Sequence, residues 1–270
     1  MINTIFNEDC LVGMNRIDDK SIDLILCDLP YGTTKNKWDS IIPLDELWMQ
    51  YERIIKDDGA IVLTSSQPFT SKLVMSNIDL FRYEWIWEKQ KAANFMQTKY
   101  APLKYHESIL VFYKQKPIYN PQKYKVVEID DILQYDKKEM LTFMNNKHYD
   151  FYGKVDRRKA VNNPKTNKQH LGSEVTRYRK VDEGFRFPKS VLKINKEVNS
   201  NIHPTQKPVA LFEYLIKTYS NEGDVVLDNC MGSGTTAISC MNTNRNYIGF
   251  ELDEVYFNKS LERIKHHKED

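Results

Sequence analysis

The sequence places four residues that could act on an amino group directly after an apolar run. Asp28-Leu29-Pro30-Tyr31 follows a strand predicted over 22–27, so its side chains should emerge at the carboxyl edge of a sheet, where open α/β folds bind ligands. An exocyclic amine has its lone pair delocalised into a ring, and acceptors that hold both N–H groups keep its nitrogen available for attack. The Asp28 carboxylate and the Leu29 backbone carbonyl are candidate acceptors, and they would also stabilise positive charge developing on that nitrogen.

The next two residues suit the same task. Pro30 fixes its own φ and biases Leu29 toward an extended conformation, which helps to aim the Leu29 carbonyl. Tyr31 offers a flat face for a base taken out of a duplex stack. Taken alone, the tetrapeptide is also consistent with a turn and a packing tyrosine. Its position after a buried strand, in a chain with a second candidate site, favours the chemical interpretation.

That second site is a turn of small residues near the C-terminal end. Residues 225–236 read as a strand, a turn containing Gly232 and Gly234, and the start of a helix. Such a turn lets a ligand approach the backbone and presents amide N–H groups to an anion or a carboxylate. No lysine follows Gly234 and Ala237 stands where a dinucleotide site needs glycine, so triphosphate and dinucleotide loops are disfavoured. Glu251, after the next strand, is placed to bind ribose hydroxyls, which together with the turn predicts an adenosine-containing cofactor. An ordinary strand-to-helix turn remains the alternative.

The elements that must position these residues alternate as in an α/β sheet. Asp57-Asp58-Gly59 is expected to end the first long helix. Helices are expected over 44–55, 69–77, 209–219 and 235–243 and after Asp253, and strands over 22–27, 60–64, 83–87, 108–113, 225–228 and 247–251.

The middle of the chain differs in composition from both ends. Residues 114–200 hold 20 Lys and Arg against 11 Asp and Glu, while the whole chain carries a formal charge of only +2. The apolar periodicity is weak in this segment. We therefore predict an inserted basic region with a polyanion-binding face, against the alternative of a solvated surface.

The overall composition narrows the class of protein. A chain of 270 residues with 41% hydrophobic residues fits one large α/β domain, or a domain with an insertion. No apolar stretch reaches the length of a membrane span, and residues 1–10 lack a secretory pattern, so we expect a cytoplasmic protein. The spacing of the four cysteines indicates neither a zinc site nor a disulfide framework, and no metal is expected.

Together these segments resemble the amino-methylating DNA methyltransferases, whose signature is Asp/Asn/Ser-Pro-Pro-Tyr/Phe with a Gly-rich S-adenosylmethionine loop. The catalytic segment precedes the loop here, as in the family's beta group. The resemblance spans most of the chain, since 7–10, 203–208, 84–89 and 106–112 are similar to further family segments. It implies a Rossmann-like methyltransferase fold, in which a twisted, mostly parallel sheet carries helices on both faces. It also implies direct methyl transfer from S-adenosylmethionine to a flipped base in double-stranded DNA.

The resemblance assigns site residues position by position. The catalytic residues would be Asp28, Leu29, Pro30 and Tyr31. The cofactor-binding residues would be Asp9, Cys10, Asp28, Lys207, Asp228, Cys230, Gly232, Ser233, Gly234, Thr235 and Glu251. Leu29 departs from the commoner proline, but the family uses that position through its backbone carbonyl. Cys230 stands where an aromatic residue is frequent, which could loosen cofactor packing.

The family also places its DNA-recognition insertion where the basic segment lies. Residues 1–113 and 201–270 would then form the catalytic domain, with 114–200 as the insertion. The candidate DNA-binding residues are Arg157, Arg158, Lys159, Lys168, Arg177, Arg179 and Lys180. His203 beside Pro204 is more often structural than catalytic, and acid-base work is not assigned to it. The resemblance leaves open whether the chain is a monomer or a homodimer.

Three alternatives remain at this point. Cytosine N4 is the nearest rival target, but Asp at the head of the tetrapeptide is commoner among the adenine-N6 enzymes and Ser among the cytosine enzymes, so adenine is favoured. Methylation of a protein amide or an RNA amine is typical of Asn-Pro-Pro-Tyr placed after the cofactor loop, the reverse of the order here. The third alternative is an inactive DNA-binding module, which intact Asp28, Tyr31 and loop glycines argue against.

Overall fold

The computed structural model describes residues 1–33, 36, 39–92, 94–128, 149–152, 185–195 and 206–269. Internal contacts divide the chain into two compact units. The first joins Met1–Pro121 to Lys189–Asp270, and the second is Gln122–Pro188. The second unit is shorter at both ends than the insertion expected over 114–200, and its role in DNA recognition stays a prediction.

Eight of the described strands form one sheet in the first unit. Their order is β1 (Thr4–Phe6), β11 (Asn246–Phe250), β10 (Val225–Asp228), β2 (Ile22–Asp28), β3 (Ile55–Ser65), β5 (His106–Phe112), β4 (Phe81–Glu88) and β9 (Val191–Lys193). β5 runs antiparallel to both of its neighbours, whereas the other described pairs in this sheet are parallel. The mostly parallel sheet expected from the sequence is confirmed.

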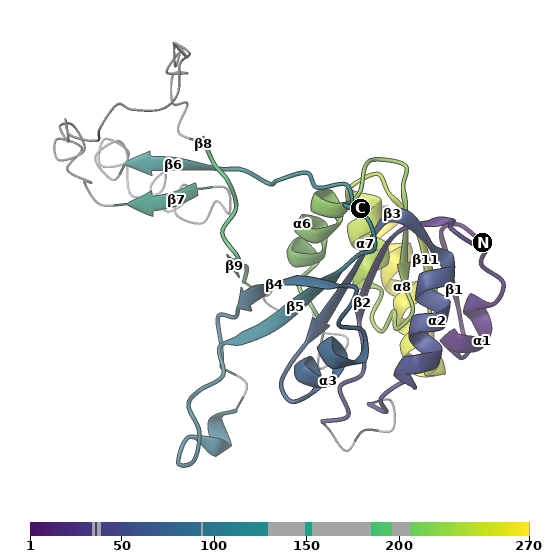
Figure 1. Ribbon diagram of the computed structural model, residues 1–270, viewed down its shortest axis with the longest axis horizontal. Helices are drawn as coiled ribbons and strands as arrows, with labels where there is room; N and C mark the ends of the chain where they lie inside the picture. Colours follow the sequence, from purple (N-terminus) through teal and green to yellow (C-terminus); the bar gives the residue numbers. More distant parts are fainter. Residues whose placement is uncertain are drawn as a thin grey trace, which may run out of the picture. The chain divides into compact units, whose positions relative to one another are not determined.

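Helices cover both faces of this sheet (Figure 1). The helices are α1 (Cys10–Met14), α2 (Leu44–Ile54), α3 (Phe69–Ser76), α6 (Val209–Tyr219), α7 (Thr235–Asn242) and α8 (Glu254–Glu269). Successive side chains of a strand point to opposite faces. Accordingly Leu24 and Leu26 of β2 pack in the core with α6, α7 and α8, while Ile25 and Cys27 pack in the core with α1, α2 and α3. The continuous apolar run of β2 is explained because both of its faces are buried.

The order in which successive strands are added to the sheet reverses beside β2. After β2 the chain continues to β3 on one side, and the later strands β10 and β11 fill the other side. Ligands of open α/β sheets bind at such a switch point, beyond the carboxyl ends of the strands. Asp28 ends β2, Asp228 ends the neighbouring β10, and Glu251 follows β11. The topology therefore places all three carboxylates along one edge.

The second unit contains a small sheet of described strands, with β6 (Tyr124–Glu128) between β7 (Tyr149–Tyr152) and β8 (Phe185–Arg186). β6 is parallel to β7 and antiparallel to β8. Lys123 Nζ lies 4.8 Å from the centroid of the Phe187 ring. No helix in the described part of the chain is both long and apolar enough to cross a membrane.

One predicted boundary is wrong. Residues 57–59 were expected to form the turn that ends the first long helix, but α2 ends at Ile54 and β3 begins at Ile55. Ile55 pairs with Ile22, and the next paired residue of β3 is Ala60, opposite Leu24, so 56–59 are accommodated by a register shift. A Cβ at Gly59 would lie 2.9 Å from the Asp23 carbonyl oxygen, which explains glycine in this bulge.

The close packing of α1 on β11 gives a test of the fold. A Cβ at Gly13 would lie 2.2 Å from Cε1 of Phe250, whose ring is fully buried and stacked on Phe6. Gly13→Ala should therefore lower the free energy of unfolding by about 1–3 kcal/mol, measured by urea denaturation. Val12→Ala, at the exposed neighbouring position, should change it by less than about 0.5 kcal/mol. Equal stability of the two variants would contradict this packing.

Candidate active site

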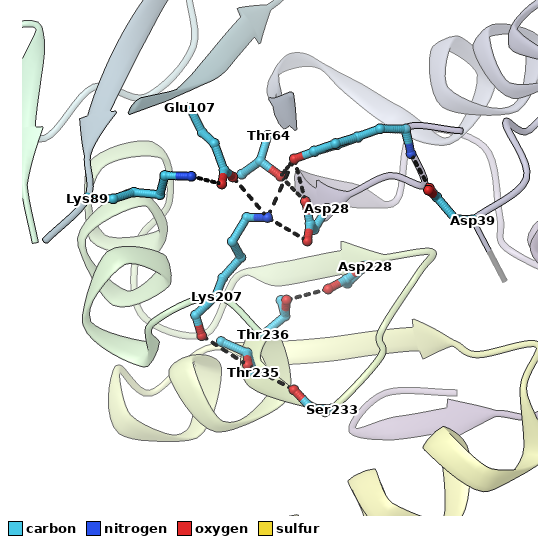
Figure 2. A network of polar contacts seen from close by, with 11 residues as sticks. Asp28, Asp39, Thr64, Lys89, Glu107, Lys207, Asp228, Ser233, Thr235 and Thr236 are labelled. Carbon is cyan, nitrogen blue, oxygen red and sulfur yellow. Dashed lines mark hydrogen bonds and ion pairs between the residues drawn. The ribbon is translucent and has the colours of Figure 1, made fainter. Parts of the chain in front are cut away.

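The carboxylate of Asp28 is surrounded by donors (Figure 2). Its Oδ1 accepts hydrogen bonds from Tyr31 Oη at 2.7 Å and from Thr64 Oγ1. Its Oδ2 accepts one from Lys207 Nζ at 2.8 Å. A carboxylate oxygen has about two acceptor positions. These contacts therefore fill Oδ1 and leave one position on Oδ2 for a further donor.

Lys207 lies between two carboxylates. Its ammonium nitrogen is 2.8 Å from Asp28 Oδ2 and 3.1 Å from Glu107 Oε2, and the other Glu107 oxygen lies 3.0 Å from Lys89 Nζ. The Lys207 side chain is only 6% exposed. Burial alone would lower the pKa of Lys207, but Asp28, Tyr31 and Glu107 outweigh it and raise that pKa well above its ordinary value. Lys207 is therefore a buried cation at neutral pH.

Glu107 and Lys89 complete this charge network. Burial alone would raise the pKa of Glu107, but the ammonium groups of Lys207 and Lys89 outweigh it and lower that pKa to about 2. Lys89 follows β4, Glu107 lies near the start of the antiparallel β5, and Thr64 lies near the end of β3. Because β5 runs in the opposite direction, all three reach the edge of the sheet at which β2 ends.

The backbone after Asp28 is held by a carboxylate that the sequence reasoning missed. Buried Asp39 accepts hydrogen bonds from the N–H groups of Tyr31 at 2.8 Å, Gly32 at 2.9 Å and Thr33 at 2.9 Å. The Tyr31 ring stacks on Phe69, with centroids 5.4 Å apart. Leu29 is buried and Pro30 is half-buried. Asp39 and Phe69 together fix the conformation of the tetrapeptide.

The Gly-rich turn closes on Glu251. The Gly232 N–H donates to Glu251 Oε2 at 2.7 Å, and the Asp253 N–H donates to Oε1 at 2.9 Å. Gly232 and Gly234 have φ of +54° and +79°, in the left-handed region that favours glycine. Burial raises the pKa of Glu251 despite these hydrogen bonds.

Asp228 supports the turn from below. The buried carboxylate accepts hydrogen bonds from Thr236 Oγ1 and from the Cys230 N–H at 3.0 Å. Burial raises the pKa of Asp228 to about 6, although both hydrogen bonds oppose that shift. Ser233 and Thr235 receive hydrogen bonds from the guanidinium of Arg263, at Ser233 O (3.0 Å) and Thr235 Oγ1 (3.1 Å). Asp228 and Arg263 therefore both stabilise the conformation of the loop.

A cluster of thiols lies beside the same loop. The buried Asn229 amide nitrogen lies 3.5 Å from Cys10 Sγ and 3.6 Å from Cys230 Sγ. Burial raises the pKa of Cys27 to about 12, and the hydrogen bond that the Cys10 thiol donates to Cys230 contributes most to the raised pKa of Cys10. Asp9 caps α1 by accepting from the N–H groups of the first turn. The described residues include no group of three or more His, Cys, Asp or Glu side chains arranged to hold a metal ion.

The structure therefore brings the predicted residues into two adjoining groups. Asp28, Tyr31 and Lys207 form the first, and the loop residues with Asp228 and Glu251 form the second. Lys207 links them, because its backbone carbonyl accepts a hydrogen bond from Thr235 Oγ1 at 3.4 Å while its ammonium contacts Asp28. His203 and the seven predicted DNA-binding residues lie outside the described residues; the seven are Arg157, Arg158, Lys159, Lys168, Arg177, Arg179 and Lys180.

Residues 22–262 match the family model N6_N4_Mtase, described as DNA methylase. The chain belongs to this family. This chain is 26% identical over 273 residues to the DNA adenine methyltransferase YhdJ of Escherichia coli strain K12, and the match covers 97% of this chain and 82% of that protein. The resemblance to DNA amino-methyltransferases, drawn from the tetrapeptide and the loop, is confirmed.

Solved structures also share the fold of the methylase. The M1.HpyAVI–SAM complex superposes with a TM-score of 0.58 at 22% identity, over 96% of this chain and 98% of that one. The PvuII DNA methyltransferase, named cytosine-N4-specific, superposes with a TM-score of 0.60 at 15% identity, over 96% of this chain and 85% of that one. The predicted Rossmann-like methyltransferase fold is confirmed.

Four residues of the network were not assigned as site residues from the sequence: Asp39, Thr64, Lys89 and Glu107. Lys89 and Glu107 lie in the segments 84–89 and 106–112, which the resemblance had linked to the target pocket. A charged residue within the strand expected to finish the target pocket, as at Glu107, is the signal that could have singled it out. Asp39 and Thr64 carry no comparable signal.

The ion pairs of Glu107 give a testable pH dependence. The folded pKa of about 2 lies below the ordinary 4.5, so the resulting stability is present above pH 4.5 and is lost as pH falls toward 2. Glu107→Gln should lower the free energy of unfolding at pH 7 by on the order of 3 kcal/mol. The gap between wild type and variant, measured by urea denaturation, should narrow below pH 4.5.

The control is Glu84→Gln, which replaces an exposed carboxylate of β4 and should change the free energy of unfolding by less than about 0.5 kcal/mol. A gap for Glu107→Gln that stays constant from pH 7 down to pH 3 would contradict the charge network.

Proposed function

We propose that this chain methylates the N6 amino group of adenine in double-stranded DNA, using S-adenosylmethionine. The observation that carries the proposal is the set of contacts made by the Asp28 carboxylate. Its carboxylate ends β2 beside the Leu29 carbonyl, it is paired with a buried cation, and it keeps one acceptor position on Oδ2. Membership of the DNA methylase family supports the same conclusion.

In this proposal Asp28 and Leu29 accept the two N–H groups of the target amine. Holding both N–H groups keeps the nitrogen lone pair out of the base ring, and the Asp28 carboxylate stabilises the positive charge that develops as the amine is methylated. The Tyr31 ring, held against Phe69, provides the surface on which a flipped base stacks. The proton leaves to solvent after transfer, so no general base is required.

Lys207 acts as the counterion of Asp28 in this scheme. The Lys207 ammonium pairs with the Asp28 carboxylate, but the same cation would repel positive charge on the amine. Glu107 lies on the other side of the ammonium, 3.1 Å away, and offsets that repulsion. The Asp28–Lys207–Glu107 arrangement thus holds the acceptor in a site with little excess positive charge.

The second group of residues is proposed to hold the cofactor. Glu251 retains acceptor positions suited to ribose hydroxyls, and the first N–H groups of α7 suit a carboxylate. Space in front of the loop fits a ligand, because a Cβ at Gly232 would have Cys230 O, 3.9 Å away, as its nearest neighbour. Bound there, S-adenosylmethionine supplies a methyl group on a sulfonium centre. Asp9, Cys10, Asp228, Cys230, Ser233, Gly234 and Thr235 complete the proposed site.

Adenine is proposed over cytosine on two grounds. Asp heads the tetrapeptide at position 28, which resembles the adenine enzymes more than the cytosine ones. YhdJ, named a DNA adenine methyltransferase, is similar over 97% of this chain. The seven cationic residues of the insertion named above are proposed to contact the DNA.

The role of Asp28 predicts a separation of binding from chemistry. Asp28→Ala should leave S-adenosylmethionine binding largely intact and lower the rate of methyl transfer by at least roughly a hundredfold, because the charged acceptor is lost. Transfer is measured with labelled S-adenosylmethionine and unmethylated genomic DNA, followed by digestion to nucleosides and mass spectrometry. N6-methyladenine is the expected product.

Asp58→Ala removes an exposed carboxylate of β3 and should methylate at the wild-type rate. A rate of methyl transfer near that of wild type in Asp28→Ala would contradict the mechanism. N4-methylcytosine as the product would overturn the target base while leaving the mechanism in place.

The cofactor loop can be tested with a matched pair of glycines. Gly232 and Gly223 both have positive φ, +54° and +86°, and both have open space around a would-be Cβ. Gly232→Trp should abolish S-adenosylmethionine binding measured by calorimetry, because the indole would occupy the space in front of the loop. Gly223→Trp carries a similar backbone strain in the turn before β10 and should bind normally. Equal affinity of the two variants would contradict the proposed site.

A further inference from the structure

The connection between β4 and β5 forms an arm that projects from the sheet (Figure 1). We define the arm as residues 89–105, in which Ala93 lies outside the described residues. Hydrogen bonds within the arm hold its two sides together. Asn94 Oδ1 accepts from the Lys104 N–H at 2.7 Å, Asn94 Nδ2 donates to Pro102 O at 3.0 Å, and the Lys89 N–H donates to Tyr105 O at 2.6 Å. These hydrogen bonds therefore give the arm a defined conformation.

The tip of the arm exposes large apolar side chains. Phe95 is 61% exposed, Met96 97% and Tyr100 90%. Phe95 and Met96 belong to the 3₁₀ turn η1 (Phe95–Gln97), and the Tyr100 N–H donates to Gln97 O at 2.9 Å, so a hydrogen-bonded turn presents all three. Contiguous apolar exposure of this kind marks a surface that contacts a partner.

The charge of the arm indicates the chemistry of that partner. Residues 89–105 contain four lysines and no Asp or Glu. Lys89 and Lys104 are engaged at the base, with Glu107 and with Ser66 Oγ respectively. Lys91 is exposed before the tip in the sequence, and Lys99 is exposed within it, next to Tyr100. Cations that flank apolar and aromatic groups complement a polyanion with stacked apolar interiors, which describes nucleic acid.

The base of the arm joins the Asp28 network. Lys89 pairs with Glu107, which also pairs with Lys207. Lys104 contacts Ser66, which directly follows the end of β3, two residues beyond the Thr64 that donates to Asp28. The arm therefore stands at the rim of the catalytic edge, where a substrate must approach.

We infer that the arm binds duplex DNA beside the target base, an inference that rests on the proposed function. Lys91 and Lys99 contact backbone phosphates, and the tip of Phe95, Met96 and Tyr100 wedges against the base stack. An apolar wedge unstacks neighbouring bases and lowers the cost of taking the target base out of the helix. The arm thus assists base flipping from outside the catalytic pocket and outside the predicted insertion.

The test compares two triple variants on unmethylated plasmid DNA. Phe95→Ala, Met96→Ala and Tyr100→Ala together remove the tip, whereas Met49→Ala, Met75→Ala and Ile78→Ala remove comparably exposed residues at α2 and α3. The tip variant should lose about fivefold or more in kcat/KM for plasmid, with unchanged affinity for S-adenosylmethionine. The control should match wild type in both.

A second variant tests the lysines independently. Lys91→Gln with Lys99→Gln should reduce the slope of log binding constant against log salt by about 0.9 for each lost phosphate contact. Either an unchanged slope or full activity of the tip variant would overturn the inference. So would a wild-type dimer, seen by sedimentation, that becomes monomeric in the tip variant, since the arm would then bind a second copy of the chain.

Wild-type methylation of the same plasmid is measured first, because it tests the proposed function separately. Absence of product with wild type would overturn the proposed function and the DNA role of the arm with it. Product with wild type, but no difference between the two triple variants, would overturn the arm alone.

Discussion

The ammonium group of Lys207 is a cation on a side chain that is only 6% exposed, and the organisation of this edge of the sheet follows from the need to keep it paired. Burying a charge costs several kcal/mol unless opposite charges and hydrogen bonds replace its hydration. Asp28 and Glu107 supply the opposite charges from β2 and β5, and Lys89 in turn balances Glu107. Ion pairs therefore hold the segments around residues 28, 89, 107 and 207 together at this edge, and moving any one of these side chains would weaken the pairing of Lys207.

Two aspartates at the ends of neighbouring strands serve different purposes because their partners differ. Asp28 has a cation beside it and retains an acceptor position, which suits contact with a substrate. Asp228 is buried and accepts from the Thr236 hydroxyl and the Cys230 N–H, and that burial raises its pKa to about 6. One carboxylate is therefore held by a cation with an acceptor position left over, and the other stabilises the backbone of the Gly-rich loop.

The sequence was sufficient where the signal was local. Two strand ends were predicted in this way, one from the apolar run of β2 with the tetrapeptide after it, and one from the small residues after β10. The structure has both strands ending at or next to the residue where they were expected to end. The contacts of Asp28 were not predictable in this way, because they depend on the order of the strands. Thr64 lies opposite Asp28 because β3 pairs with β2, and Glu107 reaches Lys207 because antiparallel β5 begins at the edge where β2 ends. The extension of β3 back to Ile55 was missed because Asp57-Asp58-Gly59 has the composition of a turn, while the register shift lets a strand absorb it.

The strand order also bears on how the protein is made. β1 pairs with β11, and β2 has β10 on one side, so the first strands that leave the ribosome wait for partners from the last quarter of the chain. Until synthesis passes residue 228, β2 keeps an unpaired edge, and Leu24 and Leu26 remain uncovered until α6, α7 and α8 have been made. Pairing over such long sequence separations is slow to form. The nascent chain therefore exposes an unpaired strand edge, the kind of surface at which chains aggregate, for most of its synthesis.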